Sequence, residues 1–399
     1  MGQEIGGQAV GPDNPAQFER YLRIETKDAC AAYARGEFSR HGPVAGFELE
    51  AWLVDQQLRP SPRNLEFLQN LGSALVVPEL SRFNVEFNGT PRPLCGYALS
   101  ELENGLLATW LQAQSVAARS GLTLLAVGVL PTLCQSDLTL ANMTPLRRYA
   151  LLNERVLQLR GGRPLRLSIN GIEQLSTMHA DVMLEAAATS FQVHLQMPAQ
   201  QAARAYNASL LLAAPLVALA ANSPLLFGKA LWHETRIPLF EQSVDCRHPD
   251  YPDRRRVTFG TGYLAEPTDD FVENLQHYQV LLPFVLPEPS SIYAHLRLHN
   301  GTIWRWSRML IGFDDNSQAH FRIEQRVMPA GPSVIDMIAN AAFFYGAAYL
   351  LAQREVAPES QLSFAQARDN FYRAARDGLT APLLWLDGHR RSAAELLQQ

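Results

Sequence analysis

The sequence predicts an α+β fold whose strands form a sheet with one polar face. Four segments alternate apolar and polar side chains, at 47–53, 83–88, 190–197 and 320–327, which is the pattern of half-buried strands. Stretches with helix start and stop signals lie between them. Of the 399 residues, 47% are hydrophobic and 18% charged, so the chain can bury a large core. The length favours two or three domains, with one large α+β domain as the alternative.

Proline and glycine mark most of the expected helix ends. Asn14 and Pro15 form an N-cap and first turn, Gly121 ends a long helix, Thr144 and Pro145 begin another, and Pro332 starts the last long helix. The expected helices are 15–35, 97–120, 144–161, 199–221, 268–282 and 332–354, followed by two shorter ones. The expected strands are 44–55, 82–89, 122–130, 190–197, 293–299, 301–309 and 320–327.

The residue types on the polar strand faces indicate a functional surface. A solvated sheet face, which is the general alternative, would favour Lys, Thr and Ser, whereas these rows hold Glu, Asn, Gln, His and Arg but no Lys. Such side chains bind metals and phosphate. The polar rows are Glu48 and Glu50; Asn84, Glu86 and Asn88; Gln192, His194 and Gln196; and His320, Arg322, Glu324 and Arg326.

If the four rows meet on one face, their carboxylates require a compensating cation. Glu48, Glu50, Glu86 and Glu324 would then converge, and like charges do not gather without compensation. Mg²⁺ or Mn²⁺ suits oxygen ligands, and His194 would supply the one nitrogen.

The arginines beside Glu324 predict an anion site. Arg322 or Arg326 would clamp a phosphoryl group, although Arg326 and Glu324 could also form a plain cross-strand ion pair. The chain has no GxxxxGK[ST] loop, so bound ATP would depend on metals and arginines.

Charge and cysteine content limit the partners and the compartment. A net charge of −5 and a pI near 6.1 argue against a nucleic-acid partner. The four cysteines are far apart and fit no metal or disulfide spacing, which favours the cytoplasm. The longest apolar run, 208–224, contains Pro215 and is shorter than the ~20 residues that span a bilayer, so we expect a buried helix and no membrane partner.

Five motifs, in this order, resemble the glutamate–cysteine ligase and carboxylate–amine ligase family of the glutamine synthetase-like superfamily. They are GFELEAWLVD, FNVEFNGTP, QVHLQM, ALAANSPLLFGKALWHETRIPLF and FRIEQRVMPAGPSVIDMIAN. The resemblance covers roughly 45–350, which is most of the chain. The resemblance implies a curved, mainly antiparallel sheet that forms a funnel-shaped active site, with helices on its outer face. It also implies ATP and Mg²⁺ or Mn²⁺ as cofactors and amino acids as substrates.

The resemblance also implies roles for individual residues. Glu324 and Arg326 would be catalytic, and Arg326, with Arg308 and Arg322, would bind the nucleotide. Arg236, Asn84 and Gln196 are candidates for substrate binding. The matching metal positions are Glu48, Glu50, Glu86, His194 and Glu324, with Glu79, seven residues before Glu86, as a further acidic ligand.

The family pattern is not complete in this chain. Many relatives have three consecutive acids where Leu49 interrupts them here, and Gln192 stands where relatives often have a histidine. These departures leave the number of metal ions and the substrate pair open. The sequence also leaves the oligomeric state open. We expect a disordered head over 1–14 and one catalytic domain over 15–399, with the site in 45–350 and C-terminal helices in 360–399.

The sequence therefore predicts a ligase that joins a carboxylate to an amine through an acyl phosphate, with glutamate and cysteine as the leading pair. Two alternatives remain open. A metal-dependent hydrolase could use the same Glu and His residues, and a non-catalytic protein on this scaffold could bind a nucleotide or an amino acid.

Overall fold

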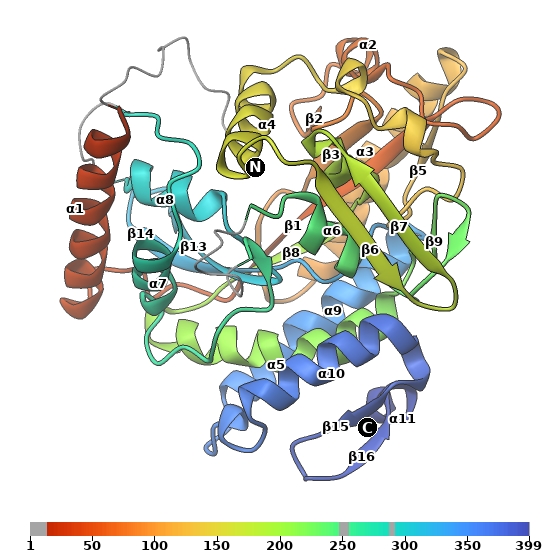
Figure 1. The fold of residues 1–399 in the computed structure, drawn as a ribbon. Coiled ribbons are helices and arrows are strands. Elements are labelled where there is room, and N and C mark those ends of the chain that lie inside the picture. The colour runs from red at the N-terminus through yellow and green to blue at the C-terminus, as the bar shows by residue number, and fades with distance from the viewer. Residues whose placement is uncertain (1–13, 247–254, 287–291, 399) are drawn as a thin grey trace.

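The computed structural model describes residues 14–246, 255–286 and 292–398 and contains both helices and strands (Figure 1). The head expected over 1–14 therefore lies outside the described residues except for Asn14, where helix α1 (Asn14–Ala34) begins.

A central antiparallel sheet carries the strands that the sequence predicts to be polar on one face. Its strand order is β13-β14-β8-β1-β3-β2, and every neighbouring pair is antiparallel. The short strands β4 and β5 also pair with β1. The bounds are β1 (Val44–Val54), β2 (Val76–Pro78), β3 (Asn84–Asn88), β4 (Arg92–Pro93), β5 (Thr123–Leu125), β8 (Phe191–Gln196), β13 (Ser307–Phe313) and β14 (Ala319–Gln325). The mainly antiparallel sheet is confirmed.

The register of the sheet places the polar rows side by side. His194 on β8 lies opposite Glu324 on β14, and Glu48 on β1 lies opposite Gln192 on β8. Glu50 lies opposite Glu86 on β3. Since alternate residues of a strand share a face, these side chains all belong to the same face of the sheet.

Helices cover the apolar face of the sheet. Leu49, Val193, Leu195 and Ile323 are buried in one large hydrophobic core, and Figure 1 shows α5 and α9 below the strands. The Tyr345 hydroxyl on α9 donates to the Gly46 carbonyl of β1 at 2.6 Å. The covering helices are α3 (Ala98–Arg119), α5 (Ala202–Ala220) and α9 (Val334–Ala352).

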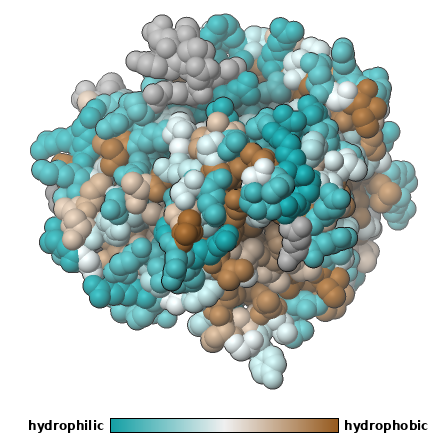
Figure 2. All heavy atoms as spheres, turned by 90° about the horizontal axis from the view of Figure 1, so that it is seen from below, coloured by the Kyte–Doolittle hydropathy of each residue, from teal (hydrophilic) through white to brown (hydrophobic). Residues whose placement is uncertain are grey.

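Two helical segments are long and apolar enough to cross a membrane by length and composition alone. One is Ala199–Ala220, which contains α5. In it, 89% of the apolar 18-residue window is buried inside the protein, so the expected buried helix is confirmed. The other is α9, where 39% of the apolar 18-residue window is buried. Ile335 and Leu350 on α9 are exposed, and Figure 2 shows hydrophobic groups among hydrophilic ones on the lower face of the molecule.

Helix α8 (Ala294–Gly301) packs between the end of the sheet and the N-terminal helix. Glu25 on α1 accepts hydrogen bonds from the His295 and Leu296 amides at 2.7 and 2.9 Å. At its other end, the Asn300 side chain donates to the Met309 carbonyl of β13 at 2.9 Å.

The remaining elements surround this sheet. The helices are α2 (Asn64–Leu71), α4 (Arg147–Leu159), α6 (Arg236–Ser243), α7 (Asp269–His277), α10 (Phe364–Asp377) and α11 (Ala393–Leu397), with a 3-10 helix η3 (Val182–Ala187). The short strand pairs are β6 (Leu165–Asn170) with β7 (Gln174–His179), β9 (Leu225–Leu226) with β10 (Lys229–Ala230), β11 (Val257–Thr258) with β12 (Trp304–Arg305), and β15 (Pro382–Leu384) with β16 (Arg390–Ser392).

Three of the expected strands differ from the structure. The segment 293–299 is not a strand but belongs to α8, because His295, Leu296, His299 and Asn300 form the buried face of a helix. The strand expected over 122–130 ends at Leu125. The strand expected over 301–309 is split into β12 and the start of β13.

Candidate active site

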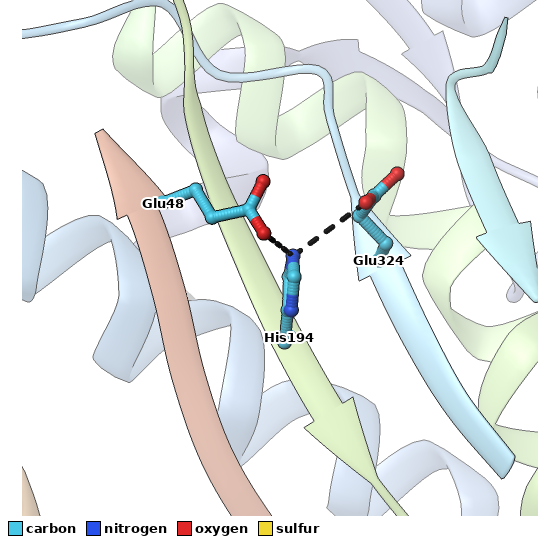
Figure 3. Close-up of side chains that lie close together, drawn as sticks. All are labelled: Glu48, His194 and Glu324. Atoms are coloured by element: carbon cyan, nitrogen blue, oxygen red, sulfur yellow. Dashed lines mark ion pairs between the residues drawn. The ribbon is translucent and has the colours of Figure 1, made fainter. Parts of the chain in front are cut away.

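Three side chains from three strands meet at the centre of the polar face. The His194 imidazole points between the Glu48 and Glu324 carboxylates (Figure 3), with Nε2 at 3.7 Å from Glu48 and 3.6 Å from Glu324. One ligand atom from each residue lies within 4.8 Å of the others, and each residue is at most 7% exposed. We call these three residues the central triad.

The central triad has the donor atoms of a metal site. His194 Nε2 is buried and has no hydrogen-bond partner within the described part of the chain. Burial, together with the Arg322 charge, lowers the pKa of His194 to about 4, so at neutral pH the ring is in the uncharged form that metals bind. One imidazole with two carboxylates fits Mn²⁺ or Mg²⁺ with further oxygen ligands.

Two arginines hold Glu324 in place. Arg308 on β13 donates to both of its carboxylate oxygens, at 2.9 and 3.1 Å, and Arg326 donates at 3.0 Å. Burial alone would raise the pKa of Glu324, but these guanidinium groups keep it well below its usual range. Arg326 also donates to Gln192 Oε1. Glu324 is therefore a fixed carboxylate anion.

Further carboxylates lie on the β3 side of the central triad. Glu50 accepts from the Ser190 amide at 2.8 Å and from Gln192 Nε2 at 2.9 Å. Glu86 accepts from Asn88 at 2.9 Å. Burial and the Glu48 carboxylate raise the pKa of Glu86 to about 7.

Three carboxylates line a small cavity at this end. Its walls include Glu50, Glu79, Asn84 and Glu185. Burial and the Glu86 carboxylate raise the pKa of Glu79 well above its usual value, and burial and Glu50 raise that of Glu185 to about 8. Repulsion between these groups would be relieved by a cation. We call Glu50, Glu79, Glu86 and Glu185 the acidic end of the site.

The other side of the central triad carries basic side chains. Arg322 on β14 lies opposite Gln196 on β8. The Gln196 amide donates to Asp314 at 3.1 Å, and His320 Nδ1 lies 2.8 Å from the same carboxylate. The charge on the polar face therefore changes sign from β3 to β14.

Two predicted substrate residues make contacts inside the protein. Arg236 is buried and donates to the main-chain carbonyls of Arg326 and Val327 at 3.0 and 2.5 Å, behind the strand that carries Arg326. The Asn84 side-chain oxygen accepts from Ser81, whereas its amide nitrogen is buried without a partner among the described residues. Both roles in substrate binding stay predictions.

The predicted site residues thus group unevenly. Glu48, His194, Glu324, Arg308 and Arg326 are brought into one cluster. The other candidates flank it: Glu50, Glu79, Glu86 and Asn84 at the acidic end, Arg322 and Gln196 on β14 and β8, and Arg236 behind Arg326.

Sequence reasoning missed two contributors. Glu185 lies on η3, outside any alternating row, so no periodic signal marks it. Gln192 joins Glu50 to Arg326, and its place in the row of His194 could have indicated this role.

Comparisons with known proteins identify the family. Residues 44–399 match the family model described as glutamate–cysteine ligase family 2. The fold resembles a crystal structure of glutamate–cysteine ligase from Francisella tularensis in complex with AMP, with a TM-score of 0.55 and 12% identity over 90% of this chain and 77% of that chain. A bifunctional glutathione synthetase from Pasteurella multocida has a TM-score of 0.47 and 10% identity over 88% of this chain and 42% of that chain. A search of curated proteins gave no match.

The family model covers the strands of the central triad and most of the rest of the chain. The protein therefore belongs to glutamate–cysteine ligase family 2.

Proposed function

We propose that this protein is an ATP-dependent carboxylate–amine ligase of the glutamate–cysteine type, which activates its acid substrate as an acyl phosphate. The observation that carries the proposal is the meeting of Glu48, His194 and Glu324 beside Arg326 on one buried polar face. Family membership supports the ligase class.

The chemistry requires two anions to approach each other. An oxygen of the substrate carboxylate attacks the γ-phosphorus of ATP, a new O–P bond forms, and the bond to the ADP oxygen breaks. The amine nitrogen then attacks the acyl carbon, the C–O bond to phosphate breaks, and the nitrogen loses a proton. Arg326 would contact the transferred phosphoryl group and offset its charge. Because Glu324 fixes the Arg326 guanidinium at 3.0 Å, this group is positioned before substrate arrives.

Glu48, His194 and Glu324 would hold a Mg²⁺ or Mn²⁺ ion, with Glu50, Glu79 and Glu86 available for others. A bound divalent ion would neutralise phosphate charge and lower the repulsion between the two anions. The unpartnered His194 nitrogen and the closely spaced carboxylates support this assignment.

Nucleotide use is supported by the neighbour from Francisella tularensis, whose structure contains AMP. We further propose that the polar face lines a funnel of the glutamine synthetase-like kind, that 15–399 form one catalytic domain, and that the protein acts in the cytoplasm. One hydrophobic core that includes both Phe18 and Leu396 supports the single domain.

The test is a phosphate-release screen with ATP and Mg²⁺ over pairs of amino acids, read by mass spectrometry of the products. We expect ADP formation that requires both an acid and an amine, together with an amide product and one phosphate per turnover. Glutamate with cysteine is the first pair to test.

The two rival functions give different results in this screen and in a control that offers amides without ATP. A hydrolase would cleave amides without ATP, and a binding protein would bind ATP and metal but release no phosphate with any pair. Either result would overturn the ligase proposal.

A further inference from the structure

Helix α1 lies outside the part of the chain that matches the family model. It covers Asn14–Ala34, whereas the match begins at residue 44. One side of α1 is nevertheless buried against α8. Phe18 on α1 is fully buried and packs edge-on against the His295 ring of α8, with ring centroids 5.3 Å apart. The family match therefore does not account for what α1 contributes to the protein.

A carboxylate of α1 caps the start of α8. Glu25 is 1% exposed and accepts hydrogen bonds from the His295 and Leu296 amides at 2.7 and 2.9 Å. Amides in the first turn of a helix have no partner inside the helix, and the N-cap residue Tyr293 supplies no side-chain cap within the described residues. An anion at this end also interacts favourably with the helix dipole. Glu25 thus caps α8 from another helix.

The His295 side chain adds a third hydrogen bond to Glu25. The Leu286 amide donates to His295 Nε2 at 3.1 Å, so Nδ1 carries the ring proton and donates to Glu25 at 2.9 Å. All three groups that α8 presents to Glu25 are therefore donors. A carboxylate can accept all three bonds, whereas a glutamine would turn an amide group towards one of the donors.

The other end of α8 holds Arg308. Its Nη1 donates to the carbonyls of Asn300 and Gly301, in the last turn of the helix, at 3.4 and 3.3 Å. It also donates to the Ile303 carbonyl at 3.4 Å. Carbonyls at a helix C-terminus favour a cation. The same guanidinium donates to both carboxylate oxygens of Glu324 at 2.9 and 3.1 Å, so α8 lies between Glu25 and an arginine that holds the central triad.

We propose that Glu25 is a positioning residue for the central triad. By fixing the N-terminus of α8, it fixes the carbonyls that orient Arg308, and Arg308 in turn orients Glu324. A helix of eight residues is about 12 Å long and stiff enough to transmit a shift from one end to the other. The proposal rests on the proposed function, in which Glu324 is a metal ligand.

A purely structural role for Glu25 has a different consequence. It would lower the melting temperature of the protein but leave the folded molecules with unchanged metal affinity and turnover. A positioning role lowers both quantities in molecules that are folded. Measurements well below the melting temperature of each variant therefore separate the two roles.

The experiment uses the full-length protein, Mn²⁺ calorimetry and the amino-acid screen with ATP. The variants are Glu25→Gln, which is nearly isosteric, and Glu25→Asp, which keeps the charge. Phe18→Leu is the matched control, because it weakens the packing of α1 on α8 but removes none of the three hydrogen bonds to Glu25. Glu19→Gln, at an exposed position of α1, controls for the loss of a charge. Circular dichroism and thermal melting check that each variant is folded.

We expect Glu25→Gln to lower Mn²⁺ affinity and turnover by about tenfold, as the loss of an outer-shell partner of a metal ligand does. Glu25→Asp should lose less than Glu25→Gln. Phe18→Leu and Glu19→Gln should stay within about twofold of the unmodified protein in both measurements. Unchanged Mn²⁺ affinity and turnover in Glu25→Gln, or an equal loss in Phe18→Leu, would overturn the positioning role.

A double-mutant cycle tests whether the effect passes through Arg308. In an Arg308→Lys background, Glu25→Gln should change Mn²⁺ affinity by less than about twofold, because the link between α8 and Glu324 is already broken. An undiminished loss in that background would overturn the proposed route. If the unmodified protein binds Mn²⁺ but turns over no pair of amino acids, the ligase function fails, and the Mn²⁺ titrations still decide the role of Glu25.

Discussion

At the scale of single residues, His194 and Glu324 differ in the contacts that they make within the protein. His194 Nε2 has no partner among the described residues, whereas Glu324 accepts from two arginines. Both are proposed metal ligands, but only Glu324 also holds other side chains of the protein, so the two should respond differently to mutation.

Replacing His194 with alanine should weaken Mn²⁺ binding by at least about tenfold, since the only nitrogen of the central triad is lost. The free energy of unfolding measured in EDTA should change less than in Glu324→Gln, because the imidazole nitrogen donates to no described residue. Calorimetric titration with Mn²⁺ and urea unfolding check the two halves of this prediction. Undiminished Mn²⁺ affinity would remove His194 from the metal site.

Replacing Glu324 with glutamine should abolish ligase turnover and also destabilise the metal-free protein. The change leaves the buried Arg308 and Arg326 without their anion, and removing one partner of a buried ion pair costs about 3 kcal/mol or more. Urea unfolding in EDTA measures this cost. An unfolding curve like that of the unmodified protein would show that the two arginines find another partner.

The sequence predicts the central triad because strand alternation decides which side chains share a face. It does not predict that Glu324 pairs with Arg308, since that contact depends on the register between β13 and β14. Glu185 escaped prediction for a related reason: a 3-10 helix brings it to the cavity, and no local periodicity encodes that approach.

At the scale of elements, β8 combines a site row and a core row in six residues. His194 belongs to the central triad on the polar face, and Leu195 is fully buried in the core on the other side. Alternation therefore predicts that a substitution in the core row lowers stability without changing metal binding by the site row.

Replacing Leu195 with alanine should lower the free energy of unfolding by about 3 kcal/mol, because a buried leucine loses its contacts and leaves a cavity. The affinity of the folded protein for Mn²⁺ should stay within about threefold. The same substitution at Leu107, which is 39% exposed on α3, should cost less than about 0.5 kcal/mol. Urea unfolding and Mn²⁺ titration of both variants test the separation.

Helix α8 shows where alternation misleads. Tyr293, His295 and Arg297 alternate with apolar residues and suggest a strand, yet the buried residues follow helical spacing. His299 on this helix lies 3.1 Å from the Asn274 carbonyl of α7 through Nε2, and its Nδ1 is buried without a partner in the described chain. Tertiary packing decides whether this segment forms a strand or a helix, and a local sequence pattern contains no information about that packing.

The buried His299 predicts acid sensitivity. Burial lowers its pKa to about 4, whereas an unfolded histidine has a pKa near 6.5. Between these values the unfolded chain binds more protons than the folded one, so this contribution is complete above about pH 6.5 and is lost as the pH falls towards 4.

Replacing His299 with glutamine, which keeps a donor but does not titrate, should reduce the loss of stability between pH 6.5 and 4 by about 3 kcal/mol. Urea unfolding at several pH values compares the slopes for the two proteins. Parallel slopes would mean that His299 does not contribute to the pH dependence.

At the scale of the whole molecule, the site concentrates carboxylates from separate parts of the chain. Glu48 and Glu50 lie on β1, Glu86 on β3, Glu185 on η3 and Glu324 on β14. A divalent cation would bind the folded arrangement and have no equivalent site in the unfolded chain.

Adding Mn²⁺ or Mg²⁺ should therefore stabilise the protein, by about 3 kcal/mol when the free ion is one hundred times its dissociation constant. Thermal melting with and without EDTA measures this, and the His194→Ala variant should show a much smaller rise. A melting temperature unaffected by either ion would contradict a divalent site on this face.

The sequence correctly predicts an α+β fold, a mainly antiparallel sheet and the strands that carry the central triad. It does not predict the hairpin of β6 and β7 or the position of α8. Composition and alternation describe what each strand faces, whereas the strand order depends on contacts between distant segments.

That strand order also affects how the chain can fold. β8 lies between β1, which precedes it by more than 130 residues, and β14, which follows it by more than 120. Neither edge of β8 finds its neighbour through a hairpin, so loops of this length must close before the backbone ladder is complete. Such non-local pairing slows folding, and a growing polypeptide can assemble the central triad only after β14 has been synthesised.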